Sequence, residues 1–94
     1  MSTISNGASN TIVAGTSGAD SVYNTGQNVT INTGDGVDTV YNSSGYKSKI
    51  NLGAGNDSLY NYYGHSVSVD AGAGNDTIYN YYSNNVTING GTGG

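Results

Sequence analysis

Residues 53–61 read Gly-Ala-Gly-Asn-Asp-Ser-Leu-Tyr-Asn, and close copies of this phrase recur along the 94-residue chain. The copies are GTSGADSVYN from position 15, GDGVDTVYN from position 34 and GAGNDTIYN from position 72. The opening glycines, including one that opens a cut-short fifth copy, are 19 residues apart: Gly15, Gly34, Gly53, Gly72 and Gly91. A fixed period of this size is typical of a stack of similar structural units. We therefore treat residues 1–94 as a single repeat domain.

Within each repeat, two segments alternate apolar and polar residues, as half-buried strands do. In the third repeat these segments are residues 58–62 and 66–69. Aligning the repeats gives one inward column of Ile12, Ile31, Ile50, Val69 and Ile88, and a facing column of Val22, Val40, Leu59 and Ile78. Val29, Val67 and Val86 add a second layer, with Ser48 as the exception. The pattern predicts an all-β fold, a flattened parallel β-solenoid of about five 19-residue turns with two short strands each.

The first copy differs in length from the others. Its loop, GTSGAD, has one residue more than the GxGxD of later copies, and the following turn is one residue shorter. Because the period of 19 is preserved, we expect a small bulge in this loop, near the N-terminal end.

Composition limits the ways in which such a chain is stabilised. Only 34% of the residues are hydrophobic, and Phe and Trp are absent, so a compact globule of this size would bury little apolar surface. Repetitive side-chain ladders are the alternative. The polar columns are Asn24, Asn42, Asn61 and Asn80, and Asn32, Asn51, Asp70 and Asn89. A tyrosine column, expected to face solvent, contains Tyr23, Tyr41, Tyr60 and Tyr79.

Charge and residue types exclude several classes of function. The net charge is −4 with only two lysines, which disfavours nucleic acid and anionic membranes as partners. The absence of Cys excludes disulfides and thiolate metal sites. No apolar run is long enough to span a membrane. With one His, no Arg and a regular repeat, the sequence indicates that the protein is not an enzyme.

The repeated phrase GxGxDx(V/L/I)x resembles the calcium-binding nonapeptide of the repeats-in-toxin (RTX) family, GGxGxDxUx, where U is a large apolar residue. The resemblance covers about half the chain. It implies secretion from bacteria, a right-handed parallel β-roll, and Ca²⁺ held between successive loops. Three departures are visible: most copies lack the opening glycine doublet, the motif occurs on one edge only, and the other turn holds no carboxylate.

The residues themselves also indicate a calcium site. Turns stacked about 4.8 Å apart place an ion midway within the Ca²⁺–oxygen range of about 2.3–2.6 Å. One aspartate per turn, unneutralised, would repel its neighbours by about 3 kcal/mol before screening. We expect Ca²⁺ ligands at Asp20, Asp38, Asp57 and Asp76, with loop glycines Gly34, Gly36, Gly53, Gly55, Gly72 and Gly74. The alternative is that Gly, Asn and Asp serve turn formation alone. Asp35 and Asp70 are expected to be solvated, and His65 to be an exposed turn residue.

Three functions follow from this pattern. The first is a calcium-binding structural protein on the bacterial surface or outside the cell, forming filaments or a segment of an adhesin or surface layer. The chain ends favour self-association, because residues 2–6 match residues 76–80 and would continue the stack head to tail. The second is a calcium-independent solenoid similar to functional amyloid. The third is an ice- or glycan-binding module, although the loop positions 35, 54 and 73 are not threonine.

Overall fold

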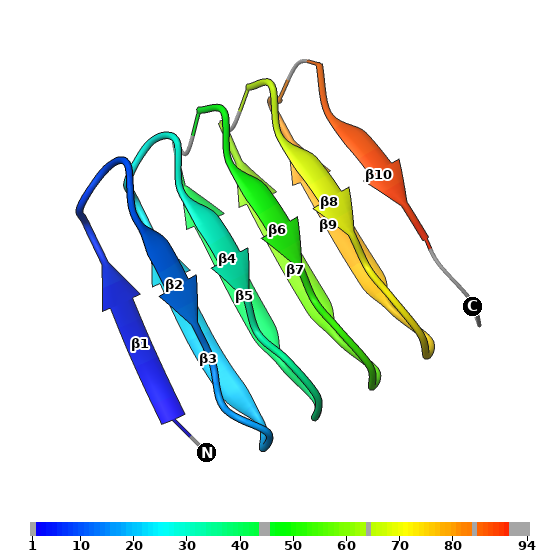
Figure 1. Ribbon diagram of the computed structural model, residues 1–94. Coiled ribbons are helices and arrows are strands. Elements are labelled where there is room, and N and C mark those ends of the chain that lie inside the picture. The colour runs from blue at the N-terminus through cyan, green and yellow to red at the C-terminus, as the bar shows by residue number, and fades with distance from the viewer. Residues whose placement is uncertain (1, 44–45, 64, 84, 91–94) are drawn as a thin grey trace.

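The computed structural model describes residues 2–43, 46–63, 65–83 and 85–90, and there it contains strands and no helix (Figure 1). The strands are β1 (Ser2–Asn6), β2 (Ile12–Ala14), β3 (Asp20–Asn24), β4 (Thr30–Asn32), β5 (Thr39–Ser43), β6 (Lys49–Asn51), β7 (Ser58–Tyr62), β8 (Ser68–Asp70), β9 (Thr77–Tyr81) and β10 (Thr87–Asn89). Odd-numbered strands form one five-stranded sheet, and even-numbered strands form a second. All pairs are parallel. The predicted parallel β-solenoid is confirmed.

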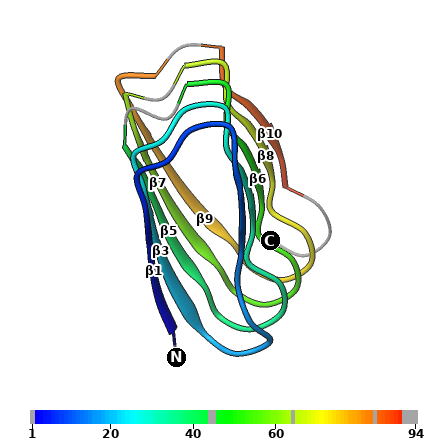
Figure 2. The ribbon, with the colours of Figure 1, turned by 60° about the vertical axis from the view of Figure 1, so that its left-hand side comes forward.

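The two sheets face one another as the walls of a flattened coil (Figure 2). Two kinds of connection join them, one along each long edge. We call the edge that carries residues 15–19, 33–38, 52–57 and 71–76 the loop edge, and the edge that carries the connections from odd to even strands the turn edge.

The core is a narrow layer of small aliphatic side chains between the walls. The facing column is confirmed: Val22, Val40 and Leu59 are fully buried, with Ile78 partly buried at the end. Val29 and Val67 are buried as expected, and Ser48 lies between them in the same column, also buried. Its hydroxyl oxygen has no hydrogen-bond partner. Burying a hydroxyl without a partner is unfavourable, so the column has one weak layer.

The inward column of the even sheet differs from the prediction at its first member. Ile12 is 71% exposed, whereas Val13 is 7% exposed and pairs with Ile31. The reason is the period. Ile4 pairs with Val22 and Val22 with Val40, each 18 residues apart, and only from Val40 to Leu59 does the spacing become 19. Alignment at a constant 19 therefore selected the wrong neighbour.

The expected bulge in the first loop is also wrong. In the structure, five residues separate Ala14 from Asp20, and five separate Asn32 from Asp38. Gly15 consequently lies beside Thr33, and Thr16, not Gly15, lies beside Gly34. The residue that lengthens the period enters between β5 and β6, on the turn edge. Gly91, the expected last opener, lies outside the described residues.

An asparagine ladder runs along the turn-edge side of the core through all five turns. The side-chain amide of each Asn donates to the side-chain oxygen of the next: Asn6 to Asn24, Asn24 to Asn42, Asn42 to Asn61 and Asn61 to Asn80, at 2.8–2.9 Å. Asn24, Asn42 and Asn61 are buried. Each inner amide thus both donates and accepts, which satisfies buried polar groups that an apolar environment would otherwise penalise.

The second predicted polar column forms only one such bond. The amide of Asn51 donates to Asn32 at 2.7 Å, while Asp70 instead accepts from the backbone N–H of Gly72. None of the described residues belongs to a helix that could cross a membrane.

Candidate metal site on the loop edge

The loop glycines adopt backbone conformations that other residues rarely reach. Gly55 has φ +116° and Gly36 has φ +104°. A Cβ built on Gly55 would lie 2.2 Å from the carbonyl oxygen of Gly36 in the preceding turn. Glycine is therefore required twice over, by the dihedral angle and by the close approach of two backbones. The same holds, with φ between +76° and +107°, for Gly34, Gly53, Gly72 and Gly74.

These loops bring the predicted aspartates into a buried column. Asp20, Asp38 and Asp57 are 2%, 0% and 1% exposed, and Asp76, at the end, is partly buried. Each carboxylate reaches back one turn. Oδ1 of Asp38 accepts the backbone N–H of Asp20 at 2.9 Å, that of Asp57 accepts from Asp38 at 2.8 Å, and that of Asp76 accepts from Asp57 at 2.9 Å. The predicted column of one carboxylate per turn is confirmed in geometry.

The second oxygen of each carboxylate lacks this support. Oδ2 of Asp38, Asp57 and Asp76 is buried and has no hydrogen-bond partner. Buried carboxylate oxygens are ordinarily hydrogen-bonded or bound to a cation, because leaving them unsolvated is costly. Three successive orphaned oxygens on one line therefore call for a positive charge or a proton.

The electrostatics of the column point the same way. Burial raises the pKa of Asp57 from its ordinary 3.8 to about 6, with repulsion from Asp38 and Asp76 adding to the increase and the backbone N–H of Asp38 opposing it. Burial likewise raises the pKa of Asp38. The ionised column is thus disfavoured unless a cation neutralises it.

The first aspartate of the column is held differently. The backbone N–H of Thr16 donates to Oδ2 of Asp20 at 2.7 Å, and the Thr16 hydroxyl donates to Oδ1 at 2.8 Å. Thr16 stands at the position of the opening glycine in later loops. The protein itself supplies donors to the Asp20 carboxylate, so this turn has less need of an ion than the later ones.

Sequence reasoning missed a buried column beside the aspartates. Thr33, Leu52 and Ala71 are all 0% exposed. They occupy the position that precedes each loop glycine, where the RTX motif has the first glycine of its doublet. The signal was available, because Leu52 breaks the polar run before the loop. These side chains close the loop edge against water and contribute to the desolvation of the carboxylates.

The remaining titratable groups lie apart from this column. Among the described residues, no three His, Cys, Asp or Glu side chains converge on one point. Asp35 and Asp70 are exposed, as predicted. His65 is only half-exposed, and its ring stacks on Tyr46 with centroids 5.1 Å apart. A cation on the loop edge would therefore take one carboxylate per turn and complete its shell with backbone oxygens.

The outer face of the odd sheet carries the predicted tyrosine column. Tyr23, Tyr41, Tyr60 and Tyr79 stack with centroids 4.9 Å apart and planes within 9° of parallel. A second pair, Tyr62 and Tyr81, stacks in the same way. Because the rings lie face to face, each inner ring presents its edge and hydroxyl outward. A ligand on this surface would meet edges and hydroxyls instead of open ring faces.

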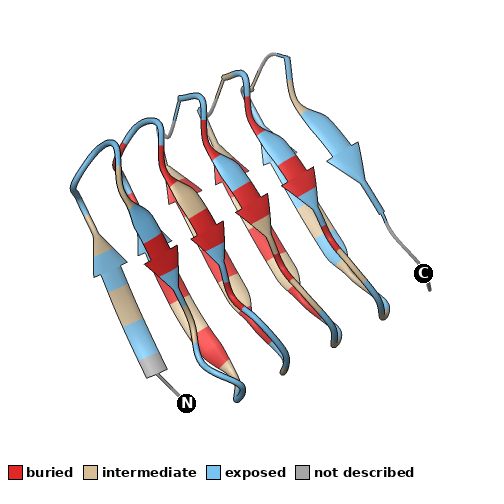
Figure 3. Ribbon diagram, viewed as in Figure 1, coloured by how far each residue is buried: buried red, intermediate tan, exposed pale blue. Residues whose placement is uncertain are grey.

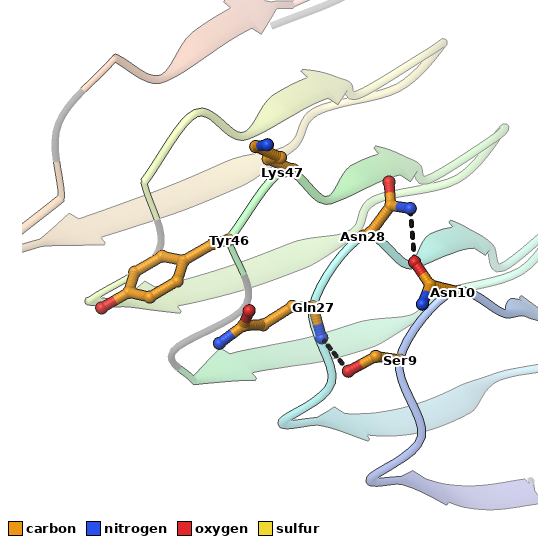
Figure 4. A pocket seen from close by; sticks show the side chains of 6 residues that line it. All are labelled: Ser9, Asn10, Gln27, Asn28, Tyr46 and Lys47. Carbon is orange, nitrogen blue, oxygen red and sulfur yellow. Dashed lines mark hydrogen bonds between the residues drawn. The ribbon is translucent and has the colours of Figure 1, made fainter.

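The turn edge carries a shallow groove of about 470 Å³ (Figure 4). It is lined by Ser9, Asn10, Gln27, Asn28, Tyr46 and Lys47. The backbone N–H of Gln27 donates to the Ser9 hydroxyl at 3.1 Å, and the Asn28 amide donates to Asn10 at 2.6 Å. The polar groups here largely bond one another along the stack, as elsewhere in the fold.

No protein-family model, curated protein or solved structure matches this chain. The argument for function therefore rests on the geometry of the loop edge.

Proposed function

We propose that the protein is a calcium-binding structural repeat protein, in which Ca²⁺ neutralises the aspartate column of the loop edge. The observation that carries the proposal is the set of three successive buried carboxylate oxygens, Oδ2 of Asp38, Asp57 and Asp76, without a hydrogen-bond partner. The resemblance of the loops to the RTX nonapeptide supports the same conclusion.

The residues fit this ion. Carboxylate and backbone carbonyl oxygens are hard ligands, which suit Ca²⁺ and not the metals that prefer His or Cys. The carboxylates would come from Asp38, Asp57 and Asp76, and the glycine-containing loops between the sheets would offer carbonyl oxygens. Bound calcium supplies positive charge to a column that repels itself. Extracellular calcium modules bind with dissociation constants of about 0.1–1 mM, so such a protein would be loaded outside the cell.

The biological role we propose is mechanical: a filament, or a segment of an adhesin or surface layer, outside a bacterial cell. The described part of the chain is a regular stack whose ladders repeat turn by turn. Such an arrangement resists extension along strands and offers long, regular faces.

A sign change in the effect of one mutation tests the calcium site. Asp57→Asn keeps an oxygen that accepts the Asp38 N–H and removes the charge. In EDTA at neutral pH this variant should be more stable than the parent protein, because a buried neutral amide is less unfavourable than a buried carboxylate. In saturating Ca²⁺ it should be less stable, because a ligand is lost. Urea unfolding followed by circular dichroism measures both.

Asp35→Asn is the matched control, because it removes one negative charge from an exposed position in an equivalent loop. Its stability should stay within about 0.5 kcal/mol of the parent in both buffers. If Ca²⁺ stabilises neither the parent nor Asp35→Asn more than Mg²⁺ does, the calcium proposal is wrong.

One observation favours a second candidate, a solenoid that folds without calcium. The asparagine ladder is continuous through all five turns and needs no ion. Full strand content in EDTA, unchanged by Ca²⁺, would favour this candidate.

A further inference from the structure

Both ends of the solenoid are uncovered. β1 pairs only with β3 and β9 only with β7, while β2 pairs only with β4 and β10 only with β8. Each end strand therefore has one free hydrogen-bonding edge. Figure 3 shows the end strands β1 and β10 largely exposed, between interior turns that are largely buried.

The C-terminal end also exposes the core. Ile88 is 46% exposed, although the residues in its column, Ile50 and Val69, are 0% and 4% exposed. Proteins usually protect such edges with charges, proline or bulges. None of β1, β2, β9 and β10 contains a charged residue or a proline.

From these two end faces we infer that a second copy of this chain stacks head to tail, with β1 of one copy on β9 of the next and β2 on β10. The inference is independent of the calcium proposal. The strand order of each sheet simply continues across the junction. In that register, Ile4 covers Ile78 and Val13 covers Ile88, so both core columns extend without interruption.

The asparagine ladder gives the contact its direction. Every described bond runs from an amide nitrogen to the oxygen of the following turn. Asn80, at the C-terminal end, accepts from Asn61 and leaves its amide nitrogen toward the open side. Asn6, at the other end, presents its oxygen, which otherwise accepts only a 3.3 Å bond from Ala8. Head-to-tail stacking joins donor to acceptor, whereas joining two C-terminal ends would oppose two donors.

A heterologous contact of this kind does not close, so it propagates into a filament. With five strand layers about 4.8 Å apart, each chain would add roughly 24 Å of length. The molecule would thus assemble with the same spacing that it has internally.

Two end-blocking variants test the direction of the contact. Ile88→Lys places a charge on the C-terminal end, and Ile4→Lys places one on the N-terminal end. Each alone should stay monomeric in sedimentation velocity at concentrations roughly tenfold or more above those at which the parent assembles, because a buried isoleucine is replaced by a charge. An equimolar mixture should form one heterodimer, through the two unblocked ends. Ile12→Lys is the matched control, because Ile12 is 71% exposed in β2, in register with Thr30 and Lys49 on the outer face. It should assemble like the parent.

Circular dichroism establishes that each variant is folded, and Ser5→Tyr provides a test that leaves the core intact. Ser5 is in register with Tyr23, so this substitution would add a ring beyond Tyr79 across the junction and should lower the concentration needed for assembly. Filaments in the parent, monomers in each blocked variant and a dimer in the mixture support the inference. A parent that remains monomeric at millimolar concentration in both EDTA and Ca²⁺ overturns it, as does a parent that stops at a closed dimer.

Discussion

Acidification of the cation-free protein should stabilise it, which is the reverse of ordinary acid denaturation. The carboxyl of Asp57 has a pKa of about 6 in the fold, against an ordinary 3.8. Between these values the folded state binds more protons than the unfolded state. The free energy of unfolding therefore falls as the pH rises through this window. The stabilising contribution is complete below about 3.8 and lost above about 6.

The magnitude follows from the same two values. Their difference corresponds to about 3 kcal/mol at about 1.4 kcal/mol per pH unit, which is an upper limit because water at the loop edge screens part of the charge. Asp38, whose pKa is also raised by burial, contributes in the same direction. Urea unfolding in EDTA at about pH 4.5 and at neutral pH measures the difference.

Two further measurements make this prediction specific. Asp57→Asn should remove much of the pH dependence, whereas Asp35→Asn should leave it unchanged. In saturating Ca²⁺ the dependence should reverse, because the ion competes with the proton for the same oxygens. If the cation-free parent is instead more stable at neutral pH than near pH 4.5, the reasoning about the buried column is refuted.

Three substitutions test other parts of the stack, each by urea unfolding against the parent protein. Ser48→Val should stabilise the fold by about 1–3 kcal/mol, because it removes a buried hydroxyl without a partner from a valine column; destabilisation would contradict this account. Asn42→Leu has nearly the same volume but removes two ladder bonds and should cost about 2–4 kcal/mol; an unchanged midpoint would show that the ladder is not stabilising. Gly55→Ala should prevent native stacking at the loop edge, since its Cβ would lie 2.2 Å from a backbone oxygen, whereas Gly7→Ala, with 3.6 Å to its nearest neighbour, should be tolerated.

The strand alternation was predictable because it depends on local pattern. Val22, Val40 and Leu59 lie inward because period-2 alternation in a strand leaves only one face for apolar side chains. The ladders of Asn and Tyr followed from the same alignment. The register of the first turn was not predictable in this way. Ile12 and Val13 are both β-branched and adjacent, so only the true length of the turn, 18 residues, decides between them.

The loop edge was predictable in composition but not in environment. The sequence places an aspartate in every turn, and the structure brings these residues into one column. That their outer oxygens are orphaned depends on Leu52 and its neighbours, which close the edge to water. Such an effect arises from packing between turns and cannot be obtained from one repeat alone.

The contrast between the two polar ladders is the strongest physical argument for a cation. Asp57, Leu59 and Asn61 point inward from the same strand, so the apolar core is bordered by a carboxylate ladder on one side and an amide ladder on the other. Stacking at about 4.8 Å favours the amides, because each donor meets an acceptor and the bonds polarise one another. The same stacking opposes the carboxylates, because each added turn adds a like charge. Lengthening the solenoid therefore strengthens one edge and weakens the other, unless an ion or a proton accompanies each new carboxylate.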